Sequence, residues 1–347
     1  MAAAGKNLNP GAEARAKKGW LKASRWLILR RISQLAVLAL FLVGPLADAW
    51  IAKANRAMPV GEQSRITQVG GVPSAKSDQP SASAARTAAT QAEPWWIVKG
   101  NMASSLTLGV LPLTDPYVLA QQFAAGHWPL TTALIGAGIV LVFYLLVGGR
   151  VYCAWVCPIN MVTDAADWLR NKLGIKGGAR FSRDTRYWLL GATLLVAAVT
   201  GTLAWELVNP VTMVFRGLVF GMGLAWGVIG MIFLLDLLVS RRAWCGHLCP
   251  VGAFYSLLGF VSPLRVSAAN RAKCDDCMDC FAVCPEQQVI KPALKGADKG
   301  LGPVILSGNC TNCGRCIDVC ARDVFQFDIR SHNTSTPGVI KKREVLP

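Results

Sequence analysis

Residues 150–158 read RVYCAWVCP, and residues 242–250 read RAWCGHLCP. Both stretches follow the pattern R-x-aromatic-C-x-x-x-C-P, and both come where a long apolar segment ends. The repeat indicates two related structural units, each ending in a pair of cysteines. The apolar segments before the cysteines then decide the fold class, because a helix that spans a bilayer needs about 20 mostly apolar residues.

Four apolar segments reach that length, and they cover approximately residues 32–52, 129–149, 187–205 and 217–239. The composition agrees, since 53% of the 347 residues are hydrophobic and the mean hydropathy is +0.38. Such a composition is atypical of a soluble enzyme. The sequence therefore predicts a mostly α-helical integral membrane protein with a four-helix transmembrane bundle.

The distribution of Lys and Arg predicts the orientation of this bundle. The first 31 residues hold eight of these residues and the connection 150–186 holds seven, whereas the longer connection 53–128 holds only six. Because cytoplasmic loops are enriched in Lys and Arg, the N-terminus, the 150–186 connection and the C-terminal region are predicted to be cytoplasmic. The formal net charge of +16 then reflects topology and contact with the membrane surface. No nucleic-acid recognition motif accompanies it.

Changes in composition predict the domain boundaries. Residues Pro59–Glu93 are rich in Ser, Ala, Gln, Gly and Pro, which is typical of a disordered linker. Beyond Pro263 the long apolar segments stop, which is typical of a separate soluble domain. A signal peptide cleaved near Ala47-Asp48-Ala49 is an alternative for the first segment, and it would leave the remaining topology unchanged. The predicted organisation is a basic cytoplasmic N-terminus (1–31), a first transmembrane helix (32–52), a periplasmic segment (53–128) with a disordered linker (59–93), transmembrane helices two to four with cytoplasmic C-x-x-x-C-P motifs (129–262), a ferredoxin-type domain (263–330) and a tail (331–347).

The C-terminal region carries two runs of four cysteines. Each run has the spacing C-x-x-C-x-x-C-x-x-x-C, which is the pattern of two-cluster bacterial ferredoxins. In that pattern the first three cysteines of a run bind one [4Fe–4S] cluster and the fourth binds the other cluster. The predicted ligands of cluster I are Cys274, Cys277, Cys280 and Cys320, and those of cluster II are Cys310, Cys313, Cys316 and Cys284.

These runs predict two [4Fe–4S] clusters in a C-terminal α+β domain of the bacterial two-cluster type. Zinc is the alternative metal for a single C-x-x-C pair, but it does not account for the complete run occurring twice. The second run has Ala321 where the first has Pro285. This difference leaves all eight thiols in place.

The remaining four cysteines are Cys153, Cys157, Cys245 and Cys249, and the predicted topology places all of them on the cytoplasmic side. A C-x-x-x-C pair on a helix lies on one face, and the following proline favours a turn. Three interpretations remain open. The four thiols could form an additional metal or cluster site, they could be two redox-active dithiols, or they could be small buried side chains that pack at helix ends.

Four stretches together resemble the NapH/MauN family, the NapH-type ferredoxin-type quinol dehydrogenase membrane components. They are RVYCAWVCP, RAWCGHLCPVGAFYSLLG, MDCFAVCPE and NCTNCGRCIDVC. The resemblance covers roughly residues 95–330, and the 59–93 linker departs from it. It implies a multi-pass protein of the bacterial inner membrane that oxidises quinol and passes electrons toward a periplasmic reductase, nitrate reductase being the expected one. The implied partners are a periplasmic iron–sulfur protein of NapG type and cytochromes c.

Ionisable side chains within or beside membrane segments are the candidates for handling quinol protons. Glu206 lies at the exterior end of the third segment and His247 lies inside the second C-x-x-x-C-P motif, while Asp236 is a weaker candidate. Each of them could instead be solvated or paired. The alternative function is a metal-reducing or assembly factor for an exported oxidoreductase, in which the C-x-x-x-C-P thiols would bind the metal.

Overall fold

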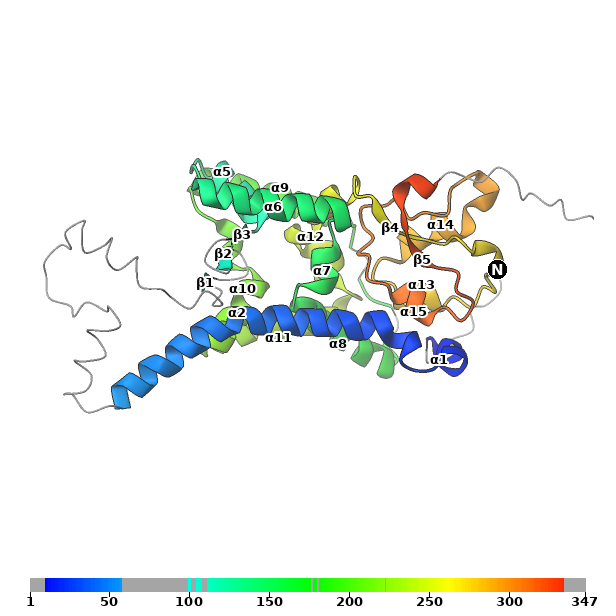
Figure 1. Cartoon of the computed structure of the whole chain (residues 1–347), viewed down its shortest axis with the longest axis horizontal. Helices are drawn as coiled ribbons and strands as arrows, with labels where there is room; N and C mark the ends of the chain where they lie inside the picture. Colours follow the sequence, from blue (N-terminus) through cyan, green and yellow to red (C-terminus); the bar gives the residue numbers. More distant parts are fainter. Residues whose placement is uncertain are drawn as a thin grey trace, which may run out of the picture.

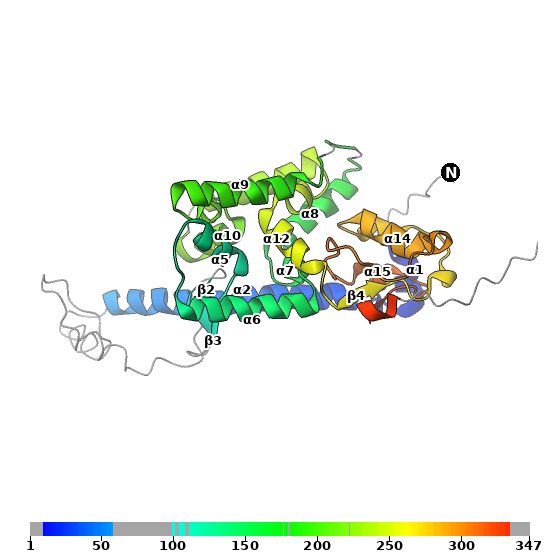
Figure 2. The same ribbon diagram turned by 90° about the horizontal axis from the view of Figure 1, so that it is seen from above.

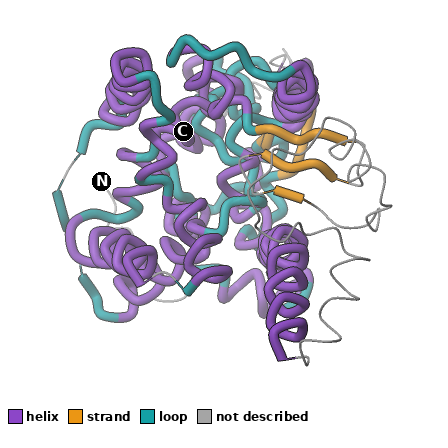
Figure 3. Tube along the Cα trace, turned by 90° about the vertical axis from the view of Figure 1, so that its left-hand side faces the viewer, coloured by secondary structure: helices purple, strands orange, loops and turns teal. Residues whose placement is uncertain are grey.

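The structure is a computed structural model that describes residues 10–57, 99–100, 104–107, 111–175, 177–179, 181–221 and 223–333. The predicted linker 59–93 and the last part of the predicted tail lie outside the described residues. A helical part and a smaller C-terminal domain lie next to each other along the longest axis (Figure 1). Most of the described chain is helical, as the sequence predicts (Figure 3).

The first elements are α1 (Ala12–Lys18), a 3₁₀ turn (Lys22–Ser24) and the long helix α2 (Arg25–Ala57). Helix α2 begins beside the C-terminal domain and runs along the whole helical part (Figures 1 and 2). The helical segment Lys22–Val43, which comprises the 3₁₀ turn and the first part of α2, has a mean hydropathy of 1.8. Among the described residues, this is the one helix that is both long and apolar enough to cross a membrane. The other apolar helices have 10–17 residues.

The rest of the helical part contains two similar successions of elements. In each, a short helix leads into an apolar helix, which is followed by a C-x-x-x-C-P motif. The first consists of α5 (Pro116–Ala124), α6 (Thr131–Val147), α7 (Val151–Trp155) and α8 (Ile159–Lys172). The second consists of α10 (Pro210–Phe220), α11 (Gly223–Leu234), two π-helical turns (Leu235–Val239 and Trp244–Leu248) and α12 (Pro250–Gly259). Helix α9 (Thr185–Thr200) and a 3₁₀ turn (Ala204–Leu207) connect them.

Both short helices begin with the same local signal. Asp115 caps α5 by accepting a hydrogen bond from the Tyr117 N–H at 2.9 Å, and Asn209 caps α10 by accepting one from the Val211 N–H at 3.1 Å. A proline follows each capping residue at the first helical position, where its missing N–H costs nothing. The internal repeat therefore extends beyond the cysteine motifs to the start of each short helix.

The fourth predicted membrane segment differs from the structure. The sequence predicts one apolar segment from residue 217 to 239, but the helix breaks at Gly221, which has the left-handed φ of 66°. Helix α10 packs back against α11 beyond this break. Glycine adopts this conformation without the steric cost that a Cβ imposes, so an apolar pattern alone does not reveal the turn.

Three short strands precede α5, namely β1 (Lys99–Gly100), β2 (Ser104–Thr107) and β3 (Leu111–Thr114). They form an antiparallel sheet in the order β1-β2-β3, and β3 packs beside α6. In the C-terminal domain, β4 (Leu264–Ser267) pairs antiparallel with β5 (Gln326–Ile329). Its helical elements are α13 (Asp279–Val283), α14 (Ile290–Lys295) and α15 (Arg315–Val319), with short 3₁₀ turns at Arg271–Lys273, Gln287–Val289, Ala297–Lys299 and Arg330–Asn333.

Candidate iron–sulfur centres and the four-cysteine cavity

The two cysteine runs of the C-terminal domain have the same backbone shape. The residue before the second cysteine of each run has a positive φ, 62° at Asp276 and 46° at Asn312. The residue after that cysteine also has a positive φ, 63° at Met278 and 72° at Gly314. These left-handed residues reverse the chain twice within each run, so that consecutive thiols can surround one volume. A short helix, α13 or α15, then follows in each run.

Each run contributes to both of two cavities. One cavity of about 360 Å³ is lined by Cys274, Cys277, Cys280 and Cys320. The other, also about 360 Å³, is lined by Cys284, Cys310, Cys313 and Cys316. The structure thus brings together the two sets of four thiols that the spacing predicts. Two cavities of equal size with four soft sulfur donors each fit two clusters of the same kind.

The two sites differ in exposure and in electrostatic surroundings. Cys277 of the first site is exposed, whereas Cys313 and Cys316 of the second are buried. Burial, together with the neighbouring Cys277, Cys274 and Cys320 thiols, raises the pKa of Cys280 to about 12. Burial would also raise the pKa of Cys313, but the guanidinium groups of Arg30 and Arg315 lower it below its usual value. Arg30 and Arg315 therefore supply positive charge beside Cys313.

The C-x-x-x-C-P motifs form the same wide turn twice. The N–H of Cys157 donates to the Tyr152 carbonyl at 3.0 Å, and the N–H of Cys249 donates to the Trp244 carbonyl at 2.9 Å. Both hydrogen bonds span five residues, as in a π-helical turn, a feature often found at functional sites. The turn that the following proline predicts at the second cysteine is present in both motifs, because α7 ends at Trp155 and Cys249 is the residue before α12.

All four of these cysteines line one cavity of about 510 Å³. Trp205, Trp244, Tyr152 and Asn209 also line it, and Asp115 is its one carboxylate among the described residues. No three His, Cys, Asp or Glu side chains of the described chain are arranged to hold a single metal ion. A mononuclear site is therefore not preformed by the four thiols. Sequence reasoning missed Asp115, for which the only local signal is an Asp-Pro pair within an apolar segment.

The arginine that begins the first motif connects this cavity to the second cysteine site. Arg150 is buried and donates to Glu286 at 2.7 Å, to the Asn309 carbonyl at 3.0 Å and to the Cys245 carbonyl at 3.2 Å. Arg186 also donates to Glu286, at 3.2 Å. Burial alone would raise the pKa of Glu286, but Arg150 and Arg186 hold it below its usual value. Glu286 directly follows the Cys284-Pro285 pair, so this cluster ties the two sites together.

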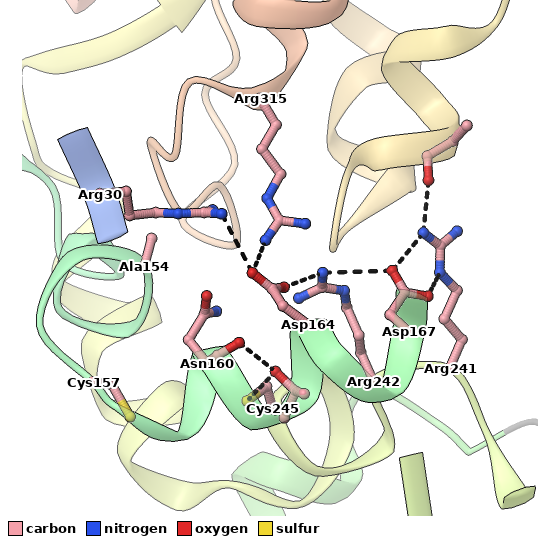
Figure 4. Close-up of polar contacts among 12 residues, drawn as sticks. Arg30, Ala154, Cys157, Asn160, Asp164, Asp167, Arg241, Arg242, Cys245 and Arg315 are labelled. Carbon is pink, nitrogen blue, oxygen red and sulfur yellow. Dashed lines mark hydrogen bonds and ion pairs between the residues drawn. The ribbon is translucent and has the colours of Figure 1, made fainter. Parts of the chain in front are cut away.

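The arginine that begins the second motif has a different partner. Arg242 donates to Asp164 of α8 at 2.5 Å, and Arg30 of α2 lies 3.3 Å from the same carboxylate (Figure 4). Arg31 and Arg315 also pair with Asp164. Figure 4 shows Asp167 beside this group, where it pairs with Arg241 at 2.6 Å. One buried carboxylate therefore joins α2, α8, the second motif and the C-terminal domain.

The structure separates the predicted quinol candidates. His247 lines a different, more open cavity with Arg183 and Phe181, and it does not line the four-cysteine cavity. Glu206 accepts hydrogen bonds from the Asn209 side chain at 2.9 Å and from the Thr212 hydroxyl at 2.8 Å. Asn209 lines the four-cysteine cavity and Glu206 does not, so Glu206 lies behind Asn209. Asp236 is buried and accepts from the Trp244 N–H at 3.0 Å, which is a structural role at the turn.

Family models match both parts of the chain. A 4Fe–4S dicluster domain matches residues 273–324, which contain all eight cysteines of the C-terminal runs. A 4Fe–4S binding domain matches twice, at residues 130–176 and 222–266. These two matches coincide with the two C-x-x-x-C-P units of the internal repeat.

Curated proteins are similar to most of the chain, whereas no solved structure matches it. The methylamine utilization ferredoxin-type protein MauN of Paracoccus denitrificans is 50% identical, over 86% of this chain and 88% of the relative. The ferredoxin-type protein NapH of Haemophilus influenzae is 43% identical, over 92% and 95%, and NapH of Escherichia coli is 42% identical, over 94% and 97%. The 4Fe–4S domains of these ferredoxin-type proteins support a role in electron transfer. The chain belongs to the NapH/MauN family of ferredoxin-type iron–sulfur proteins.

Proposed function

We propose that this chain is the membrane-bound subunit that oxidises quinol and passes the electrons through two [4Fe–4S] clusters toward a periplasmic reductase. The observation that carries the proposal is the position of the four-cysteine cavity. It is enclosed by the helical part, and Arg150 joins its Cys245 wall to the Glu286 and Asn309 side of the second cysteine site. A donor bound there would be next to an electron acceptor.

Placement of the helical part in a bilayer rests on its outer surface. Helices α2, α6, α9 and α11 carry large apolar side chains that are at least half exposed, which a soluble protein rarely gathers on one surface. At about 1.5 Å per residue, a 17-residue helix is about 25 Å long, slightly less than a typical hydrocarbon core. The exposed side chains include Ile32, Leu35, Ile135, Val142, Phe143, Leu146, Trp188, Leu195, Val199, Leu224, Met231 and Leu234.

Contacts between the two ends of the chain support a shared cytoplasmic side. The Gly11 N–H donates to Asp279 at 2.8 Å, and the Lys18 ammonium donates to the Cys320 carbonyl. The N-terminal region and the ferredoxin-type domain therefore lie on the same side of the helical part. With four crossings and the Lys and Arg distribution, that side is the cytoplasm.

In this function the chain's own residues hold, orient and shield the redox groups. Cys274, Cys277, Cys280 and Cys320 would hold cluster I, and Cys284, Cys310, Cys313 and Cys316 would hold cluster II. When bound, such clusters supply one-electron transfer at potentials set by burial, hydrogen bonds and nearby charge. Arg150 and Glu286 fix the distance between the cavity and the second site, and Arg30 and Arg315 supply positive charge beside it.

The expected partners are a periplasmic iron–sulfur protein of NapG type and cytochromes c, with nitrate reductase as the terminal enzyme. Two MauN relatives are 50% and 45% identical to the chain, and two NapH relatives are 43% and 42% identical. The MauN proteins are named for methylamine utilization. A methylamine-related electron-transfer chain is therefore the other candidate pathway.

A second candidate function is a metal-reducing or maturation factor for an exported oxidoreductase. The double match of a 4Fe–4S binding domain at the C-x-x-x-C-P units favours a third metal or cluster site at Cys153, Cys157, Cys245 and Cys249. All four thiols line one cavity, and soft sulfur donors of this kind suit a metal or cluster site. In that function the site would bind metal tightly and would not react with quinol.

Anaerobic reduction separates the two functions. The oxidised, cluster-loaded protein in lipid nanodiscs is mixed with a reduced menaquinol or ubiquinol analogue, and bleaching of the visible iron–sulfur absorption is recorded. Quinol oxidation predicts bleaching, and its loss in Cys153→Ser or Cys245→Ser would make the repeated motif part of the path. Absence of bleaching with either quinol, while dithionite still reduces the clusters, would refute direct quinol oxidation by this chain.

A further inference from the structure

Asp115 is held in place through one of its two carboxylate oxygens, Oδ1. Its Oδ1 accepts from the Tyr117 N–H at 2.9 Å and from the Tyr255 hydroxyl at 3.0 Å. Among the described residues, no hydrogen bond reaches its second oxygen, Oδ2. Because Asp115 lines the four-cysteine cavity, this carboxylate offers a hydrogen-bond acceptor to whatever the cavity binds.

The support of Asp115 is rigid. Tyr255 is buried, it stacks on Tyr152 at a centroid distance of 4.9 Å, and it meets Tyr144 edge-on at 5.1 Å. A Cβ at Gly149 would lie 1.9 Å from the Tyr255 carbonyl oxygen, so the backbones of the two repeats are in close contact there. The hydroxyl that orients Asp115 is therefore fixed before any ligand arrives.

The internal repeat shows that a carboxylate is not needed for the fold at this position. Asn209 is the equivalent capping residue of the second repeat, and it also lines the cavity. Since Asn and Asp cap helices about equally well, an amide satisfies the capping requirement. The two capping residues differ in charge, because Asp115 has a carboxylate where Asn209 has an amide. Asn209 in turn donates to Glu206, which is half-buried and lies behind the cavity wall.

We propose that Asp115 binds a hydroxyl of the quinol in the four-cysteine cavity and accepts its proton. This inference rests on the proposed function and names the acidic residue of its substrate site. Oxidation of one quinol to a quinone releases two electrons and two protons. Two bound [4Fe–4S] clusters, held by the two sets of four cysteines, would supply the two one-electron oxidants that this oxidation needs. The first proton passes to Asp115 and leaves on the Glu206 side, and the second follows once Asp115 is again ionised.

The test compares wild type with Asp115→Asn, Asp115→Glu and the exposed control Asp184→Asn, each as the full chain with intact clusters in nanodiscs. One measurement is the rate of quinol bleaching. The other is binding of 2-heptyl-4-hydroxyquinoline N-oxide, a quinol analogue whose fluorescence falls on binding. A proton acceptor contributes on the order of 100-fold or more in rate. We therefore expect Asp115→Asn to bleach at least about 100-fold more slowly and to bind the analogue more weakly, with Asp184→Asn unchanged.

The rank of the two substitutions separates chemistry from structure. If Asp115 acts through its carboxylate, Asp115→Glu retains more activity than Asp115→Asn. If it acts only as a helix cap, the order reverses, because Asn preserves both the cap and the side-chain size. Wild-type bleaching with an equal rate in Asp115→Asn would overturn the assignment of Asp115 and leave quinol oxidation standing. Wild-type protein that quinol does not bleach, but dithionite does, would overturn both.

Discussion

Replacing Asp164 by asparagine should destabilise the whole helical part, because this carboxylate neutralises four arginines from three regions of the chain. Its side chain is 8% exposed, and those of Arg30 and Arg242 are 1% and 3% exposed. Removing one partner of a buried ion pair costs about 3–5 kcal/mol, since the remaining charge stays buried and unpaired. Asp167 can neutralise part of the charge on Arg242, at 3.5 Å, so we expect the lower end of that range.

Thermal unfolding in nanodiscs, followed by tryptophan fluorescence, measures this loss. One kcal/mol shifts the Tm of a domain of moderate size by about 2–4 °C, so 3 kcal/mol predicts a fall of at least about 6 °C. Asp298→Asn, which changes an exposed aspartate, is the matched control. A double-mutant cycle with Arg315→Gln should give a coupling energy of about 0.5–3 kcal/mol. A Tm for Asp164→Asn within about 1 °C of the control would refute this reasoning.

The same carboxylate predicts a pH dependence. Burial alone would raise the pKa of Asp164, but Arg315, Arg242 and Arg30 hold it well below its usual range. A depressed carboxyl pKa stabilises the folded state above the unfolded-state pKa, and this stabilisation is lost as the pH falls toward the folded-state value. The difference in Tm between wild type and Asp164→Asn should therefore stay constant from about pH 8 to about pH 5 and shrink only below 3.8, the ordinary pKa of an aspartate.

Three further predictions concern close packing, cluster ligation and domain docking. Gly149→Ala should reduce the yield of folded protein, because the new Cβ would lie 1.9 Å from the Tyr255 carbonyl oxygen. The control Gly138→Ala should be tolerated, because a Cβ there meets nothing within 4 Å. Equal yields of the two variants would contradict the close approach at Gly149. Cys280→Ser and Cys320→Ser should each remove the same electron paramagnetic resonance signal, because both cysteines line the first cavity. Cys284→Ser and Cys316→Ser should each remove the other signal, because both line the second cavity. The crossed ligation would be contradicted if the single variants Cys280→Ser and Cys284→Ser lost the same signal. Glu286→Gln should remove the ion pairs of Glu286 with Arg150 and Arg186, which hold the ferredoxin-type domain against the helical part. Limited proteolysis between these two parts should therefore become faster. An unchanged cleavage rate would show that the ion pairs do not hold the domain.

Local spacing predicts that the eight ferredoxin-type cysteines group into two sets of four. Short gaps between ligands restrict which thiols can reach one volume, and the structure surrounds two cavities with the expected sets. The repeat of R-x-aromatic-C-x-x-x-C-P left open whether its four cysteines share one site, and in the structure they line one cavity. The repeated hydrogen bond across five residues was not predictable, because the proline in each motif indicates a turn but not which hydrogen bond closes it.

The remaining features depend on contacts between distant residues. Asp164 meets Arg30 and Arg315, and Asp115 meets Tyr255, through pairs that no local pattern connects. The two motif arginines look equivalent in the sequence, yet Arg150 pairs with Glu286 and Arg242 pairs with Asp164. His247 was selected because it lies inside a motif, but its side chain lines another cavity. Position in a motif does not determine which way a side chain points.

The four-arginine cluster around Asp164 has a consequence for biosynthesis. Arg30 and Arg31 are synthesised well before Arg315, which belongs to a segment between two cysteines almost 300 residues later in the chain. Helix α2 is therefore synthesised long before its full set of partners exists. Since Arg315 lies between Cys313 and Cys316, cofactor insertion and the final anchoring of that helix are expected to be completed together. A chain that fails to acquire its iron would expose a loosened N-terminal helix, which gives the cell's proteases a way to recognise it.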